Sequence, residues 1–145
     1  MKIQFKKLVP EAQKPKFGKP GDAGADLVAT SIVVDDSKDN QIVYGTGLAV
    51  EIPEGMVGLV FPRSSVRNYD LTMSNSVGVI DSGYRGEIMV TFNIKPGLLD
   101  KRKMYSLGDR IAQLVIMPVP LAQYVEVEEL SETERNTSGH GSTGA

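Results

Sequence analysis

Acidic, cationic and hydroxyl side chains gather in five stretches, most of them rich in glycine or serine: PGDAGADL (20–27), FPRSSV (61–66), NSVGVIDSGYRGE (75–87), GDRIAQLVI (108–116) and RNTSGHGSTG (135–144). Carboxylates, arginines, hydroxyls and backbone N–H groups suit the handling of phosphates with Mg²⁺, which prefers oxygen ligands and keeps several waters. The chain has no cysteine and one histidine, so the set does not suit zinc, and a cysteine nucleophile is excluded. The sequence also lacks the GxxxxGKS/T and GxGxxG fingerprints of standard nucleotide-binding folds.

The first two stretches each allow a structural and a functional interpretation. In PGDAGADL, Asp22 and Asp26 lie among glycines and alanines that permit close backbone approach, but an acidic turn would look the same. In FPRSSV, Arg63 and two serines follow Pro62 at an expected helix start, which favours an anion site. An N-cap beside a surface arginine is the alternative.

The third and fourth stretches are equally open. Asp81 lies between a Val-Ile pair that anchors the chain in the core and a turn, where a carboxylate could act as a general base. A polar hairpin with an internal salt bridge is the alternative for this segment. Gln113 interrupts an apolar run in the fourth stretch, and it is either a satisfied inward polar group or a ligand contact.

The fifth stretch lies in a C-terminal segment without large apolar residues. From Ser131 onward the only apolar residue is Ala145, so burial cannot offset an ordering cost of about 1–2 kcal/mol per residue. We therefore expect a single domain over residues 1–130 and a flexible strap over 131–145. The strap is either a disordered end or a segment that orders on ligand.

The elements that must position these stretches are short and rich in β-branched residues. Segments bounded by glycine or proline predict strands: MKIQFKKL, SIVV, GLAVEI, MVGLVFP, GEIMVTFNI and RIAQLVIMPV. EIPEG and IKPG are typical of turns, and PRSSVRNYD (62–70) is the one segment that favours a helical turn. The pattern predicts an all-β fold, a barrel or a jelly-roll sandwich.

Charge and length narrow the class of protein. The 145 residues carry 16 Lys and Arg against 18 Asp and Glu, a net charge of −2, which argues against duplex DNA or an anionic membrane as partner. No apolar run approaches a membrane span, and the start lacks the apolar stretch of a signal peptide. We expect a cytoplasmic protein that acts on a small anionic ligand.

Taken in order, the stretches resemble the five motifs of the trimeric dUTPases, as AGADL (23–27), PRSS (62–65), GVIDSGYRGE (78–87), GDRIAQL (108–114) and RNTSGHGSTG (135–144). The resemblance implies a distorted jelly-roll, or β-clip barrel, that forms a homotrimer with three active sites at subunit interfaces. It also implies Mg²⁺-dependent hydrolysis of dUTP to dUMP and pyrophosphate, which keeps uracil out of DNA and supplies dUMP for dTTP synthesis.

The same resemblance implies roles around the nucleoside. Asp81 would orient and deprotonate the water that attacks the α-phosphorus, and it would also contact the sugar 3′-OH. Tyr84 would pack under the deoxyribose and leave no room for a 2′-OH. The uracil edge would be recognised by a further set: Asn75, Gly78, Val79, Ile80 and Met89.

Around the phosphates, the resemblance implies donors from the adjacent subunit and from the strap. These are Arg63, Ser64, Ser65, Gln113, Arg135, Gly141, Ser142 and Thr143. Asp26 would support Mg²⁺ through water. His140 would stack on the uracil, where most relatives carry Phe, and Asn136 stands where many carry Gly.

Two other functions remain open. A dCTP deaminase shares the fold, but it needs an acid–base residue at the pyrimidine 4-position, typically a glutamate, where this hairpin has Asn75. A non-catalytic nucleotide-binding regulator is the second alternative. The complete hydrolase motif around Asp81 and the complete strap argue against both.

Overall fold

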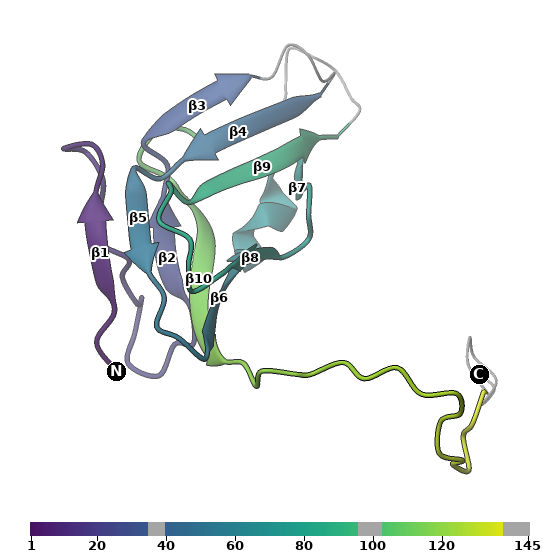
Figure 1. Ribbon diagram of the computed structural model, residues 1–145. Helices are drawn as coiled ribbons and strands as arrows, with labels where there is room; N and C mark the ends of the chain where they lie inside the picture. Colours follow the sequence, from purple (N-terminus) through teal and green to yellow (C-terminus); the bar gives the residue numbers. More distant parts are fainter. Residues whose placement is uncertain (35–39, 96–102, 138–145) are drawn as a thin grey trace.

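The computed structural model describes residues 1–34, 40–95 and 103–137, and Figure 1 shows a body built almost entirely of strands. In chain order the described elements are β1 (Gln4–Lys7), β2 (Ala25–Val28), β3 (Ser31–Val34), β4 (Gln41–Gly45), β5 (Leu48–Glu51), β6 (Met56–Pro62), the 3₁₀ helix η1 (Ser64–Asn68), β7 (Leu71–Met73), β8 (Gly78–Ile80), β9 (Met89–Ile94) and β10 (Arg110–Pro118).

The strands form three antiparallel sheets around one core. Their orders are β2-β10-β6-β8, β3-β4-β9-β7 and the two-stranded β1-β5. Alternate residues of β2 and β4 are buried, as the period of two in a strand requires. The largest fully buried side chains include Tyr44, Phe92 and Leu27, which come from β4, β9 and β2.

The all-β prediction is confirmed, and the strands expected at SIVV and MVGLVFP have the predicted bounds. The sequence analysis missed β2, β4, β7 and β8. β7 and β8 have three residues each, and β2 and β8 lie inside motifs rich in glycine and aspartate, so composition pointed to turns. Their pairing with β9, β10 and β6 makes them strands.

The helical turn expected over residues 62–70 is present as η1, but it is a 3₁₀ helix of five residues. Arg63 occupies the N-cap, and no side chain caps the helix, so the expectation of a serine cap is wrong. A single 3₁₀ turn has a much weaker dipole than an α-helix. Any anion bound here must be held mainly by side chains.

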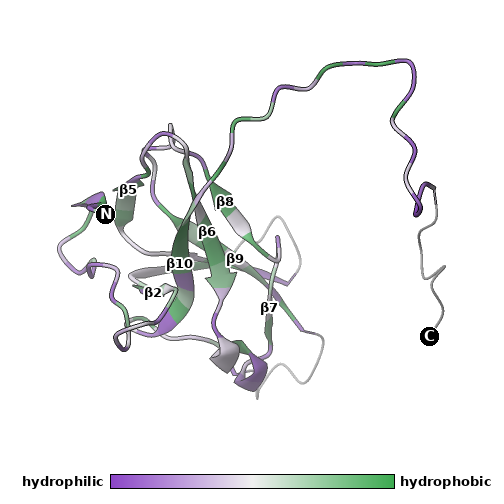
Figure 2. Cartoon of the chain, turned by 90° about the horizontal axis from the view of Figure 1, so that it is seen from below, coloured by the Kyte–Doolittle hydropathy of each residue, from purple (hydrophilic) through white to green (hydrophobic). Residues whose placement is uncertain are grey.

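Beyond Pro118 the chain leaves the body as an extended arm, residues 119–137, as Figures 1 and 2 both show. Its large apolar side chains are exposed, with Tyr124 at 95% and Leu121 and Leu130 almost as open. None of the helices in the described part of the chain is long and apolar enough to span a bilayer.

Candidate active site

A polar pocket of about 540 Å³ opens where β2, β6 and β10 meet. β10 pairs with both other strands, so Gln113 lies beside Asp26 on one side and Phe61 on the other. This register brings together the first, second and fourth motif stretches. The lining residues are Gly18, Lys19, Asp22, Ala23, Gly24, Asp26, Arg63, Ser64, Arg110 and Gln113.

Asp26 holds two arginines at the wall of this pocket. Its Oδ1 accepts a hydrogen bond from Arg63 Nε at 2.7 Å, and its Oδ2 accepts one from Arg110 Nη1 at 3.1 Å. The Asp26 side chain is only 15% exposed, so the pairing is worth more than a surface ion pair. Two cations against one carboxylate leave one positive charge, which suits an anionic ligand.

Gln113 is both satisfied and exposed to the pocket. Its Nε2 donates to Pro62 O at 3.3 Å, and its Oε1 lies over Gly24, where an added Cβ would approach to 2.6 Å. Gly24 therefore gives Gln113 the room to lie across the strands. Of the two roles left open by the sequence, the structural one is present and the ligand contact remains a prediction.

The donors of this pocket can be tested for their fit to Mg²⁺. Among residues 1–34, 40–95 and 103–137, no three His, Cys, Asp or Glu side chains form a group that could hold a metal. Each Asp26 oxygen accepts one guanidinium N–H and retains a lone pair for a water. The set fits a Mg²⁺ that arrives on phosphate oxygens and keeps its waters, and it does not form a cage of protein ligands.

Asp81 lies exposed at the end of β8, where a turn begins. Its backbone carbonyl accepts the Tyr84 N–H at 3.1 Å, and Arg85 Nη1 donates to Ser82 O at 2.7 Å. Arg85 pairs with Glu51 of β5 at 3.4 Å, so its ion pair ties the turn to the body and is not internal to the hairpin. The turn thus presents the Asp81 carboxylate to solvent on a supported backbone.

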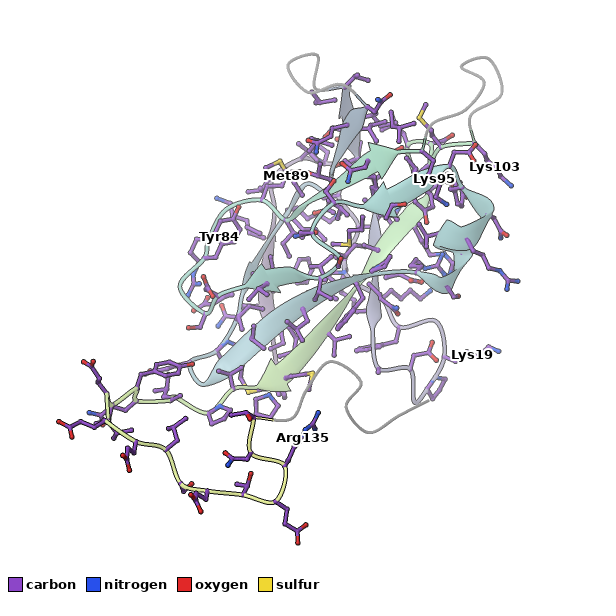
Figure 3. The ribbon with its side chains drawn as sticks, turned by 90° about the vertical axis from the view of Figure 1, so that its right-hand side faces the viewer. Lys19, Tyr84, Met89, Lys95, Lys103 and Arg135 are labelled. Carbon is purple, nitrogen blue, oxygen red and sulfur yellow. The ribbon has the colours of Figure 1, made fainter. Side chains whose placement is uncertain are left out.

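Tyr84 lies over the same turn, with its ring resting on Gly86. Its hydroxyl donates to Glu87 O at 2.9 Å, and a Cβ on Gly86 would collide with that hydroxyl. Figure 3 shows Tyr84 and Met89 on the same side of the body, and both are exposed, as is Val79. Exposed apolar side chains beside Asp81 offer surface for a sugar and a base.

Asn75 lies in the turn between β7 and β8. The turn is tight, since Ser76 has a φ of 59°, a conformation that few non-glycine residues adopt. A Cβ added to Gly78 would lie 3.6 Å from Asn75 Nδ2 and 3.2 Å from Val60 Cβ. Gly78 therefore keeps space open beside the Asn75 amide.

The polar pocket and the Asp81 turn lie at opposite ends of β6. Ile80 pairs with Gly58, and Asp81 continues toward the start of β6, whereas Arg63 follows its last residue. The five residue-to-residue steps from Gly58 to Arg63 span roughly 16 Å at about 3.3 Å per step. In Figure 3, Tyr84 and Lys19 accordingly lie on opposite sides of the body.

The strap residues are only partly described. Arg135 is in the arm and is labelled in Figure 3. His140, Gly141, Ser142 and Thr143 lie outside the described residues, so their roles stay predictions.

With this geometry in place, comparison with known proteins settles the family. The dUTPase family model matches residues 10–144. The chain belongs to the dUTPase family. It is 46% identical over 144 residues to the deoxyuridine 5′-triphosphate nucleotidohydrolase of Corynebacterium glutamicum, covering 98% of this chain and 94% of that protein. It is 43% identical over 147 residues to the protein of the same name from Rhodococcus erythropolis, covering 99% and 87%.

Solved dUTPase structures have the same fold. A dUTPase of Staphylococcus bacteriophage 80alpha with dUPNHPP matches at a TM-score of 0.85 and 30% identity, covering 99% of both chains. A dUTPase of phage phi11 of S. aureus, described with a structural Mg(II) ion, matches at 0.74 and 29% identity, covering 89% of this chain and 98% of that one. The predictions of the family, of its jelly-roll-like fold and of a nucleotidohydrolase are confirmed.

The sequence analysis missed two cationic residues of this dUTPase pocket. Arg110 was quoted within the fourth stretch but given no role, and Lys19 precedes the first motif. The sequence carried no signal for Arg110, because residues three apart in a regular strand point to opposite faces, and a register shift between Arg110 and Ala112 in the pairing with β2 changes that alternation. No signal in the sequence pointed to Lys19.

Proposed function

We propose that the protein hydrolyses dUTP to dUMP and pyrophosphate with Mg²⁺ as the metal. The observation that carries this proposal is the match to proteins named deoxyuridine 5′-triphosphate nucleotidohydrolase over 98% or more of the chain. The exposed Asp81 and the cationic pocket around Arg63 supply the chemistry that such a reaction needs. The proposed roles in the cell are to keep uracil out of DNA and to supply dUMP for dTTP synthesis, in the cytoplasm.

The proposed step is attack by water on the α-phosphorus. Asp81 accepts the water's proton as the new oxygen–phosphorus bond forms, and the bond to the oxygen that bridges the α- and β-phosphates breaks, releasing pyrophosphate. Such a transfer needs charge neutralisation and in-line placement more than covalent help. Arg63, Ser64, Ser65 and Gln113 would supply donors to the phosphates, and Asp26 would hold through water a Mg²⁺ that would supply further charge neutralisation.

Recognition of the nucleoside is proposed for the turn side of the body. The Asn75 amide and the backbone from Gly78 to Ile80 would pair with the uracil edge, and Met89 would pack nearby. A Cβ added to Gly78 would lie 3.2 Å from Val60 Cβ, so we propose that a uracil fits closely here and that a 5-methyl group would be excluded. Tyr84 would face the sugar and exclude a 2′-OH.

We further propose a homotrimer whose sites are shared between subunits. A separation of roughly 16 Å along β6 prevents Asp81 and Arg63 of one chain from meeting the same α-phosphate. The arm also exposes Leu121, Tyr124 and Leu130, which supports a partner for that segment. In this assembly residues 1–130 form the domain, and residues 131–145 close over a neighbour's site.

The test of the function is a panel of dUTP, dCTP, dTTP and UTP with Mg²⁺, with products identified. We expect pyrophosphate and dUMP from dUTP, with the other three nucleotides turned over far more slowly. Formation of dUTP from dCTP would identify a deaminase instead, and binding without any product would identify a regulator. Release of inorganic phosphate alone would contradict attack at the α-phosphorus.

Replacing Tyr84 by Ala should weaken discrimination against the ribose. The ring is a rigid plate beside the Asp81 turn, and its loss opens space for a 2′-OH. We expect the ratio of kcat/KM for UTP to that for dUTP to rise about 10-fold or more. Tyr84→Phe is the matched control: it removes only the bond to Glu87 O and keeps the plate, so the ratio should stay low. Equal ratios in all three proteins would place sugar selection elsewhere.

Mixing two inactive chains should restore part of the activity. An Asp81→Asn chain and a chain lacking residues 135–145 carry defects in different parts of a shared site. After unfolding and refolding of an equal mixture, up to about one quarter of the sites combine an intact Asp81 with an intact strap. Refolding each chain alone is the control. No gain in dUTP turnover on mixing would indicate sites contained within single chains.

A further inference from the structure

An aromatic cluster packs behind η1, the turn that carries Ser64 and Ser65. The Tyr105 ring lies 4.0 Å from that of Tyr69, 5.7 Å from Phe92 and 6.1 Å from Tyr44. Tyr69 is the C-cap residue of η1, and its N–H donates to Val66 O at 3.0 Å. The position of the turn therefore depends on this cluster.

The interior of the cluster is buried. Burial raises the pKa of the Tyr44 hydroxyl to about 12, and this hydroxyl donates to Tyr105 O at 3.1 Å. The bond fixes the backbone of Tyr105, and the surrounding rings fix its side chain. Tyr105 is thus held rigidly, five residues before β10 begins.

The Tyr105 hydroxyl is buried without a hydrogen-bond partner among the described residues. Tyr105 is 3% exposed, and its oxygen is the single buried side-chain atom left unpaired in that part of the chain. Burial raises its pKa, whereas a side-chain hydrogen-bond interaction with Ser65 and, more weakly, the Arg63 guanidinium lower it, so the two hydroxyls are neighbours although no hydrogen bond of good geometry joins them. A buried hydroxyl without a hydrogen-bond partner destabilises the folded protein, so its presence here calls for a functional explanation.

Ser65 can supply the missing partner. A serine hydroxyl accepts two hydrogen bonds and donates one. Arg63 Nη1 already donates to Ser65 Oγ at 3.4 Å, which leaves one acceptor position and one proton. If Tyr105 fills the acceptor position, the Ser65 proton can only point away from both donors.

We propose that Tyr105 is a positioning residue for Ser65 in phosphate binding. When a phosphate enters and Ser65 rotates slightly, Tyr105 Oη donates to Ser65 Oγ, and the Ser65 hydroxyl donates to a phosphate oxygen. Tyr105 never touches the substrate. Its hydrogen bond to Ser65 directs the Ser65 proton toward the phosphate. The inference rests on the proposed role of Ser65 in holding phosphates.

Tyr105→Phe tests the proposal, because it keeps the ring and removes only the hydroxyl. We expect KM for dUTP to rise about 3- to 10-fold, the effect of losing one hydrogen bond, with kcat little changed. The melting temperature of the ligand-free protein should not fall, since the lost hydroxyl has no partner there. Tyr69→Phe, a hydroxyl removed from the ring stacked on Tyr105, is the matched control and should leave KM unchanged.

A double-mutant cycle with Ser65→Ala separates positioning from packing. In the Ser65→Ala background, Tyr105→Phe should change KM less than about 1.5-fold, because its only route to the phosphate is gone. The proposal would be overturned if Tyr105→Phe changed KM equally in the wild-type and Ser65→Ala backgrounds. It would also be overturned if Tyr69→Phe changed KM as much as Tyr105→Phe does.

The same double-mutant cycle can be measured as the Kd for inorganic triphosphate with Mg²⁺, which does not depend on turnover. If the wild-type protein fails to hydrolyse dUTP, the proposed function fails, and the Kd cycle still decides the role of Tyr105. An unchanged Kd in Tyr105→Phe would overturn that role alone.

Discussion

Asp81→Asn should lower kcat for dUTP by about 10²–10⁴, the range for a positioned general base. Asparagine has the same shape as aspartate but cannot accept the proton of the attacking water. Asp81 is exposed, and its backbone carbonyl, which the substitution keeps, accepts the Tyr84 N–H, so the substitution should leave the fold and dUTP binding largely intact. Single-turnover rates and Kd for dUTP separate the chemical step from binding.

Glu54→Gln is the matched control, because it neutralises another exposed carboxylate near the start of β6, one to which no role in the site is assigned. It should hydrolyse dUTP at the wild-type rate. An Asp81→Asn protein that also retained the wild-type rate would remove Asp81 from the mechanism and require another base.

Deleting residues 135–145 should remove most of the turnover, on the order of 10²-fold, while leaving the proposed trimer intact. The deleted segment holds Arg135, Ser142 and Thr143, the proposed strap donors to the γ-phosphate, and the closure that excludes water. Misplacement of a triphosphate by about 1 Å already costs about 10² in rate. The apolar side chains of the arm, Leu121 to Leu130, remain in the shortened chain.

The readouts are dUTP turnover and molar mass by light scattering. A chain that lacks only Ala145 is the control and should match the wild type in both. A deletion protein with full activity would contradict the strap, and one that dissociates to monomers would show that residues 135–145 hold the assembly together.

Local sequence predicted much of the fold. Ile32, Val33 and Val34 are β-branched and follow one another between breakers, and the strand β3 has the predicted bounds. Short strands such as β8 were not predicted, because a glycine such as Gly78 is at least as typical of a turn as of a strand. What makes Gly78–Ile80 a strand is the bonding partner β6, about twenty residues earlier, and no local signal encodes that pairing.

The motif residues could also be recognised in the sequence, because their residue types and order do not depend on a structure. The sequence did not show which of them lie close together in space. Asp26 meets Arg63 across 37 residues of chain and Arg110 across 84, because β10 lies between β2 and β6. Tyr105 lies outside all five motif stretches, and only packing against Tyr69 places its hydroxyl near Ser65.

The sequence by itself therefore determined the fold class, because it follows from residue type and local spacing, and it supplied the candidate site residues through the resemblance of the five stretches to the dUTPase motifs. The tertiary structure decided the strand order and register, and with them that the Asp81 turn and the Arg63 pocket lie at opposite ends of β6. The physical reason is that register is set by burial of one face of each strand against residues distant in the chain, a constraint that no short window of sequence contains.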